Sequence, residues 1–288
     1  MKLVTNTCTP CKQYSIEELV DMMHEAGFDA IDFSFDAAPY NKREGEEFRA
    51  WLKTIRERAE SKGMRFTQAH APFPSSDADP EKNEEIFQSI VRSIEHASIL
   101  GVDIIVVHPM QHLTYIEGDN AEKLFEMNMA FYRRLEPYCK KYGVKVALEN
   151  MYQVPLRRKT MNSTCGRPAE FNRYLDELNS EWFVGCLDIG HAVLLSEDPA
   201  NFIRQMGKDR LKCLHVHDVD GQNDSHTLPY FGIINWDSVA AALREIGYDG
   251  EFTYECGYFF SPLPREIYPA AFKMAEATGR HLIRKIEG

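Results

Sequence analysis

The sequence predicts a single (β/α)8 barrel that spans residues 1–288. Three observations support this fold class: the chain length, amphipathic stretches that repeatedly end at Gly or Asn, and a short apolar run after each of these ends. A TIM barrel of eight strand–helix units typically needs about 250 residues, so this chain is long enough for one barrel. No linker or shift in composition marks a second domain.

The predicted helices end at residues that tolerate a left-handed backbone, as a helix C-cap requires. These residues are Gly27, Gly63, Gly101, Gly143, Asn179, Gly207 and Gly247. The first helix also has a clear start, because Ser15 and Glu18 have the spacing of a capping box. Ile86, Ile90 and Ile94 repeat at helical spacing in the third unit. The pattern therefore indicates one βα unit after another.

The predicted strands are short and apolar. They cover residues 3–5, 30–35, 66–69, 104–107, 145–148, 183–187, 211–216 and 252–254, and a final helix follows at about 265–285. Continuous apolar runs are typical of parallel strands covered by helices, and eight is the number of strands in a closed barrel. A doubly wound open sheet is the alternative, but no Gly-x-Gly-x-x-Gly follows a strand to support it.

The composition is that of a soluble globular protein, with 44% hydrophobic and 27% charged residues. A formal net charge of −11 at pH 7 argues against nucleic acid or an anionic membrane as a partner. The chain shows no basic, apolar leader and no apolar run of roughly 18 residues, so we expect a cytoplasmic protein. Cys8 and Cys11 have redox or zinc spacing, but without a second pair the cysteines are expected to be reduced thiols.

Polar residues follow six consecutive predicted strands. They are His70, His108, Glu149, Asp188 with His191, His215 with His217, and Glu255. Any one of them alone would more often be a hydrogen-bonded structural residue. In a barrel, however, the carboxyl ends of the strands meet at one mouth, where so many buried charges would cost several kcal/mol each. A divalent cation among them is the simplest compensation.

These segments resemble the xylose-isomerase-like barrels, a superfamily that includes sugar phosphate isomerases and epimerases, ketose 3-epimerases and inosose dehydratases. The resemblance is carried by QAHAPF at 68–73, VVHP at 106–109, ALEN at 147–150, LDIGHA at 187–192, LHVHD at 214–218 and YE at 254–255. Each motif is weak alone. Six in this order at successive strand ends, covering nearly the whole chain, are specific for the superfamily but not for a substrate.

The resemblance implies a metal centre and an acid/base pair. It assigns one divalent ion to Glu149, Asp188, His215 and Glu255, and this oxygen-rich set favours Mn²⁺, with Mg²⁺, Co²⁺ or Zn²⁺ as alternatives. It further implies that Glu149 and Glu255 are catalytic and transfer an α-proton through an enediolate. The reaction would be isomerisation or epimerisation of a small sugar or polyol.

Further residues are expected to contact that substrate. They are His70, His108, His191, His217, Asp224, His226 and Arg157, and for the histidines the alternative is a supporting hydrogen bond. Arg157 stands in a basic trio that could clamp a phosphate or carboxylate, although such a loop is more often solvated. The aromatic run 258–260 could wall the pocket or form a contact in a homo-oligomer.

Three other functions are alternatives to the predicted isomerase or epimerase. An inosose dehydratase-type lyase would use the same proton abstraction. An apurinic endonuclease-like zinc phosphodiesterase is favoured by nine candidate ligand positions, which include Asp224 and His226, and opposed by the lack of a basic stripe. A catalytically silent sensor with the same fold is the third alternative. The DNA-repair members of the superfamily use three zinc ions, so the resemblance implies that about three zinc ions per chain would indicate the endonuclease and one Mn²⁺-like ion the sugar enzyme.

Overall fold

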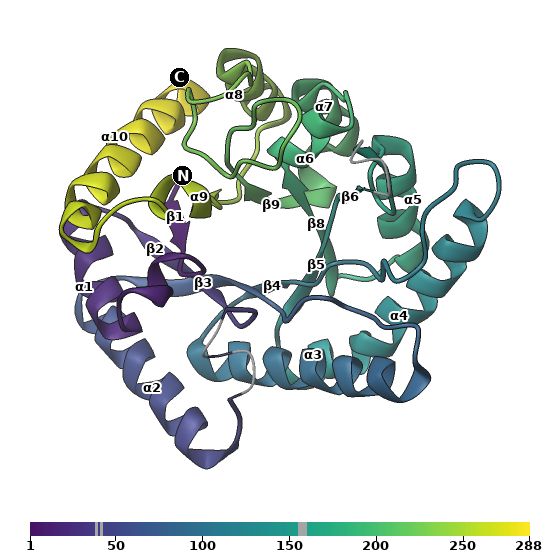
Figure 1. The fold of residues 1–288 in the computed structure, drawn as a ribbon, viewed down its shortest axis with the longest axis horizontal. Helices are drawn as coiled ribbons and strands as arrows, with labels where there is room; N and C mark the ends of the chain where they lie inside the picture. Colours follow the sequence, from purple (N-terminus) through teal and green to yellow (C-terminus); the bar gives the residue numbers. More distant parts are fainter. Residues whose placement is uncertain (38–39, 41–42, 155–159) are drawn as a thin grey trace.

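The computed structural model describes residues 1–37, 40, 43–154 and 160–288. Eight strands surround one axis (Figure 1): β1 (Leu3–Asn6), β2 (Ala30–Ser34), β3 (Arg65–His70), β4 (Ile104–Val106), β5 (Lys145–Glu149), β8 (Phe183–Asp188), β9 (Leu211–His215) and β10 (Phe252–Tyr254). All neighbouring pairs are parallel, in the order β10-β1-β2-β3-β4-β5-β8-β9. The predicted strands are therefore confirmed, and each end agrees with the prediction to within one residue.

The last and first strands of this order also meet. Val216, just after β9, bridges Tyr254 on β10 in parallel. The Val216 N–H donates to the Thr253 carbonyl at 2.8 Å, and the Glu255 N–H donates to the Val216 carbonyl at 3.1 Å. These bonds close the sheet, so the predicted (β/α)8 barrel is confirmed.

Helices form a ring outside the strands (Figure 1). The long ones are α1 (Ile16–Ala26), α2 (Gly45–Ser61), α3 (Pro80–Leu100), α4 (Ala121–Tyr142), α5 (Pro168–Leu178), α7 (Pro199–Arg210), α8 (Trp236–Ile246) and α10 (Tyr268–Glu287). Shorter helices are η1 (Pro10–Lys12), α6 (Ile189–Leu194), α9 (Gly257–Phe260) and η2 (Arg265–Ile267). Among the described residues, no helix is long and apolar enough to cross a bilayer.

The helix ends follow the sequence prediction, except that α2 is capped by Lys62, one residue before Gly63. The capping box of Ser15 and Glu18 is formed at the start of α1. Asn179 ends α5 in the left-handed conformation, with φ 44° and ψ 50°. Gly207 also ends a helical segment, as predicted: its φ of 67° and ψ of 167° are not helical and divide α7 into two helical parts. A short second part runs to Arg210, and the chain then enters β9 at Leu211.

Two features of the mouth are absent from the predicted element list. After β5 the chain forms a small antiparallel pair, β6 (Tyr152–Gln153) with β7 (Met161–Asn162). After β9, a loop is held by the buried Asp218, whose carboxylate accepts hydrogen bonds from the backbone N–H of Tyr230 and Ile234 and from Trp236 Nε1. Both features depend on contacts between residues 8 to 18 positions apart, across loops whose course the strand and helix patterns do not predict.

Candidate metal centre

Four predicted ligands meet at the carboxyl end of the barrel. Glu149, Asp188 and His215 are the last residues of β5, β8 and β9, and Glu255 directly follows β10. Each offers one ligand atom, and these atoms all lie within 4.8 Å of one another. Glu149, Asp188 and His215 are buried, whereas the Glu255 side chain is 20% exposed. The strand order thus brings together residues that are up to 106 positions apart in sequence (149 to 255).

His215 lies between the two glutamates. Its Nδ1 atom is 3.2 Å from Glu149 Oε1, 3.2 Å from Glu255 Oε2 and 4.0 Å from Asp188 Oδ2. Nδ1 is buried and makes no hydrogen bond within the described chain. A buried nitrogen without a partner, facing three carboxylates, is the arrangement that a divalent cation satisfies. The donor set of three carboxylates and one imidazole therefore fits a hard or borderline divalent ion.

The imidazoles around the site favour ionised carboxylates. Burial opposes ionisation of Glu149, but the charges of His215 and His108 hold the pKa of its carboxyl well below the ordinary value. Burial likewise opposes ionisation of Asp188, and the charges of His191 and His217 lower the pKa of its carboxyl. Because metal ligands must be deprotonated, both side chains are ready to bind a cation.

Each glutamate has a further histidine beside it. His108 Nε2 is 2.9 Å from Glu149 Oε2, and His70 Nε2 is 3.6 Å from Glu255 Oε1. The His70 ring also stacks on the His215 ring, with centroids 4.4 Å apart. The structure therefore places His70 and His108, both predicted as substrate contacts, next to the two predicted acid/base residues.

A second cluster lies beside the first. It comprises His191, His217, Asp224 and His226, whose ligand atoms also lie within 4.8 Å of one another. His226 Nε2 is 2.8 Å from Asp224 Oδ2, and His191 Nε2 is 3.5 Å from the same atom. His217 Nε2 is 2.9 Å from Asp188 Oδ2, so it links the two clusters. These four residues were predicted as substrate contacts, and the structure groups them as a second candidate ion site.

Hydrogen bonds within the second cluster favour the charged forms of Asp224 and His226. Burial opposes ionisation of Asp224, but hydrogen bonds from His191 and His226 hold the pKa of its carboxyl well below the ordinary value. Burial disfavours the charged form of His226, yet the hydrogen bond to Asp224 raises the pKa of this imidazole to about 10. The Tyr152 hydroxyl donates to Asp224 Oδ2 at 3.2 Å, so the β6–β7 pair supports this side of the mouth.

Asp32 and Gln68 lie at the site although neither was predicted there, and Asn150, which was predicted to follow the fifth strand at the mouth, lies beside them. Asp32 on β2 joins His70 and His215 in a third group of possible ligands. The Gln68 amide lies 3.2 Å from His215 Nε2, and the Asn150 amide donates to the Asp188 carbonyl at 2.9 Å. A charged Asp32 inside an otherwise apolar strand was the available signal, because buried charges are rare without a role.

The remaining predicted contacts lie at the rim or beyond the described chain. Arg157 falls among residues 155–159, outside the described residues. Tyr258 is 61% exposed and its ring meets the edge of His226 at 5.7 Å, so it stands at the wall of the mouth. Phe260 is buried and packs on Phe272 and Tyr268. The aromatic run is thus divided between the wall and the core.

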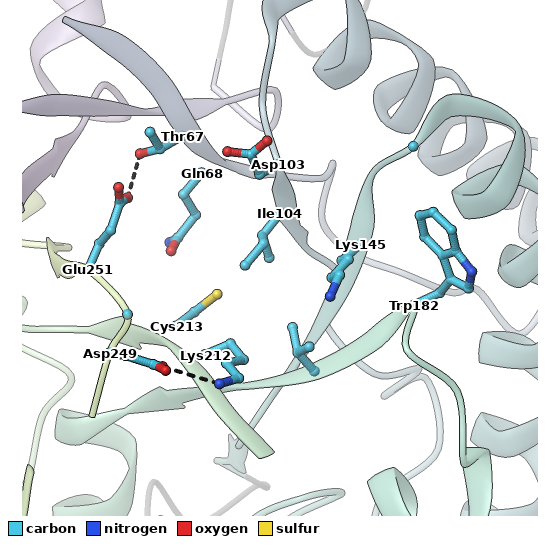
Figure 2. Close-up of a pocket in the computed structure, with 13 residues that line it drawn as sticks. Thr67, Gln68, Asp103, Ile104, Lys145, Trp182, Lys212, Cys213, Asp249 and Glu251 are labelled. Atoms are coloured by element: carbon cyan, nitrogen blue, oxygen red, sulfur yellow. Dashed lines mark hydrogen bonds and ion pairs between the residues drawn. The ribbon is translucent and has the colours of Figure 1, made fainter. Parts of the chain in front are cut away.

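A hollow of about 460 Å³ opens at the opposite end of the barrel (Figure 2). Its lining includes Lys145, Lys212, Asp249 and Glu251, from the amino ends of strands and the turns before them. Asp249 accepts from Lys212 Nζ at 3.2 Å, and Glu251 accepts from the Thr67 hydroxyl. Because these carboxylates already have partners and no histidine lines the hollow, its described residues do not form a metal site.

Known proteins match the chain along most of its length. Residues 20–276 match the family model described as Xylose isomerase-like TIM barrel. The uncharacterized protein MJ1311 of Methanocaldococcus jannaschii is 27% identical over 248 residues, which cover 84% of this chain and 79% of that protein. The uncharacterized protein y4fM of Sinorhizobium fredii is 26% identical over 261 residues, 83% of this chain and 80% of that protein.

Solved structures share the fold at lower identity. A D-tagatose 3-epimerase-like protein superposes with a TM-score of 0.78 and 22% identity, covering 100% of this chain and 98% of the other. An IOLI protein with a bound zinc atom gives a TM-score of 0.77 and 18% identity, with coverage of 100% and 98%. A D-psicose 3-epimerase crystallised with D-fructose gives 0.75 and 15%, with full coverage of both chains. At these identities the likeness establishes the fold alone.

Proposed function

Because this chain belongs to the xylose isomerase-like TIM barrel family, we propose that it is a divalent-metal-dependent isomerase or epimerase of a small sugar or polyol. The observation that carries the proposal is the group of Glu149, Asp188, His215 and Glu255 at one end of the barrel. Proteins that resemble it in fold include a D-psicose 3-epimerase and an L-ribulose 3-epimerase, which agrees with such a substrate.

These four residues would hold one divalent ion, with Mn²⁺ favoured by the oxygen-rich donor set and Mg²⁺, Co²⁺ or Zn²⁺ as alternatives. When bound, such an ion polarises the substrate carbonyl and stabilises the charge that develops after proton removal, an effect worth several kcal/mol. The neighbouring imidazoles, which depress the pKa of Glu149 and Asp188, keep these ligands ionised.

Glu149 and Glu255 are the proposed proton-transfer residues. They approach His215 Nδ1 from different strands, at 3.2 Å each, and each has its own histidine neighbour. One carboxylate would remove the proton next to the carbonyl, and the other would return a proton. Return to the opposite face of the same carbon gives epimerisation, whereas return to the adjacent carbon gives aldose–ketose isomerisation. Loss of a neighbouring hydroxyl instead would give the dehydratase reaction.

The test is hydrogen exchange. The Mn²⁺-loaded protein is incubated with a panel of ketoses and inososes in D₂O, and deuterium at the α-carbon is measured by NMR. We expect exchange with the wild type and a loss of roughly 10²–10⁴-fold with Glu149→Gln or Glu255→Gln. Product analysis of the reactive substrate then separates epimer, isomer and dehydrated product. No exchange with any carbonyl sugar would contradict the proposal.

A zinc phosphodiesterase of the apurinic endonuclease type is the second candidate. The observation that favours it is the second cluster of His191, His217, Asp224 and His226, which could hold a further ion. Metal analysis separates the two candidates: about three zinc ions per chain with cleavage of abasic DNA favours the phosphodiesterase. One ion per chain, with no DNA cleavage, favours the sugar enzyme and agrees with the net charge of −11.

A further inference from the structure

Asp32 is a buried carboxylate in the barrel interior. It lies on β2, its side chain is fully buried, and it faces His70 on the neighbouring strand β3. His70 Nδ1 is 3.0 Å from Asp32 Oδ2 and 3.2 Å from Asp32 Oδ1. A carboxylate at this depth costs several kcal/mol unless its charge is compensated. His70 Nδ1 is the partner of Oδ1, whereas Oδ2, although 3.0 Å from the same nitrogen, makes no hydrogen bond within the described chain.

The other nitrogen of His70 faces the mouth. Nε2 is 3.6 Å from Glu255 Oε1, is buried, and makes no hydrogen bond within the described chain. The ring plane is fixed by stacking on His215, at 20° between planes. His70 is therefore held at Nδ1 by Asp32 and on one ring face by His215. Its Nε2 atom has no hydrogen-bond partner within the described chain and lies beside Glu255, a proposed proton-transfer residue.

Resting on the proposed function, we propose that Asp32 is a positioning residue that accepts the Nδ1–H of His70 and directs Nε2 toward an oxygen of the bound sugar, beside Glu255. An imidazole that donates from Nδ1 to a carboxylate has its orientation and the position of that proton set by the partner. A fixed contact of this kind reduces the entropy lost when the substrate is oriented for proton transfer.

The substitution that tests this is Asp32→Asn. Both carboxylate oxygens lie within 3.2 Å of Nδ1, so an amide of the same shape replaces one of two acceptors by an NH2 group that can donate to Nδ1, and the preference for a proton on Nδ1 is weakened. In ¹⁵N-histidine NMR spectra of the protein loaded with diamagnetic Mg²⁺, with His70 assigned through His70→Gln, we expect a protonated Nδ1 in the wild type and a shift of the proton away from Nδ1 in Asp32→Asn. We expect kcat for α-proton exchange to fall about 10–100-fold while metal content stays unchanged.

Asp29→Asn is the matched control. The Asp29 carboxylate also accepts hydrogen bonds, from Arg280 and from the Leu3 N–H. Asp29 directly precedes β2, however, at the end of the strand opposite the mouth. It should lower thermal stability at most and leave the His70 spectrum and kcat unchanged. Asp32→Ala, which removes the acceptor without a new donor, should also lower kcat.

Three results would overturn the inference. The first is an unchanged His70 spectrum in both Asp32 variants. The second is a lowered melting temperature with an unchanged kcat, which would make the pair purely structural. The third is the loss of one bound ion from the Asp32 variants, which would make Asp32, His70 and His215 ligands of a cation. A wild type that exchanges no sugar proton contradicts the proposed function instead, and the spectrum still decides the role of Asp32.

Discussion

The carboxylates at the two ends of this barrel differ in their partners and in their burial. At the amino end, Glu251 and Asp249 pair with Lys2, Lys212 and the Thr67 hydroxyl, and their charges remain close to water. At the carboxyl end, Glu149 and Asp188 are buried and have imidazoles as their charged partners in the described chain, and Asp188 also accepts from the His191 backbone N–H. Pairs of the first kind contribute roughly 0–1 kcal/mol to stability. Those of the second kind are costly without a cation, so the contrast separates a structural end of the barrel from the end where we propose that the reaction takes place.

Replacing one glutamate by glutamine at each end of the barrel should give the largest difference in metal affinity and in α-proton exchange. Glu149→Gln removes an ionised ligand and a proposed proton-transfer group, so divalent-ion affinity should collapse and α-proton exchange should fall roughly 10²–10⁴-fold. Glu251→Gln should change the free energy of unfolding by about 1 kcal/mol or less and leave both readouts intact. Calorimetric titration with Mn²⁺ measures the metal affinity of both variants, and the exchange assay measures their activity. Equal effects from the two variants would erase the proposed contrast.

Removing the metal should affect stability next most strongly. An ion that binds the folded chain at 100 times its dissociation constant stabilises it by about 2.7 kcal/mol. Chelation should therefore lower the melting temperature in differential scanning calorimetry, and added Mn²⁺ should restore it. Glu149→Gln serves as the control and should not respond to Mn²⁺. A wild type whose melting temperature ignores both treatments would count against a metal site.

Gly190→Ala tests whether the support of the mouth matters. A Cβ atom at Gly190 would lie 2.2 Å from His217 Cε1 and would push this ring away from Asp188. We expect Mn²⁺ affinity to fall about 10–100-fold. Gly279→Ala is the control, because its Cβ would crowd Leu3 Cδ1 at 2.4 Å, away from the ligands. It should reduce stability and keep the affinity, and a similar loss of affinity in both variants would refute the assignment.

Glu170 offers a smaller test, as a largely buried carboxylate without a facing imidazole. Burial raises the pKa of its carboxyl from 4.5 to about 7, and Oε2 makes no hydrogen bond within the described chain. Between about pH 4.5 and 7 the folded state binds more protons at Glu170 than the unfolded state does. The contribution of this group to the free energy of unfolding is therefore complete below pH 4.5 and is lost as the pH rises to about 7. Glu170→Gln should be more stable than the wild type at pH 8 by about 1–2 kcal/mol, and not at pH 4.

Urea unfolding of both proteins at the two pH values measures this effect. Because Glu149 has imidazole partners that lower its pKa, its dependence on pH has the opposite sign. A difference between Glu170→Gln and the wild type that is the same at pH 4 and pH 8 would show that Glu170 is not proton-linked to folding.

The sequence was most informative where the parallel sheet fixes geometry. Eight apolar runs predicted the strands, and parallel strands place their carboxyl ends together, so Glu149, Asp188 and His215 could be predicted to converge. Asp32 was missed, because one charged residue within a strand does not reveal which neighbour it faces. The β6–β7 pair and the loop anchored by Asp218 were also missed, because they depend on hydrogen bonds across irregular loops, where no hydrophobic period predicts the path of the chain.

The central claim is that one divalent ion binds between Glu149, Asp188, His215 and Glu255. The most direct measurement is anomalous X-ray diffraction from crystals of the Mn²⁺-loaded protein. We predict one strong manganese peak within bonding distance of all four side chains at the carboxyl end of the barrel. A peak only at another position, or no peak in a protein that is otherwise folded, would contradict the account.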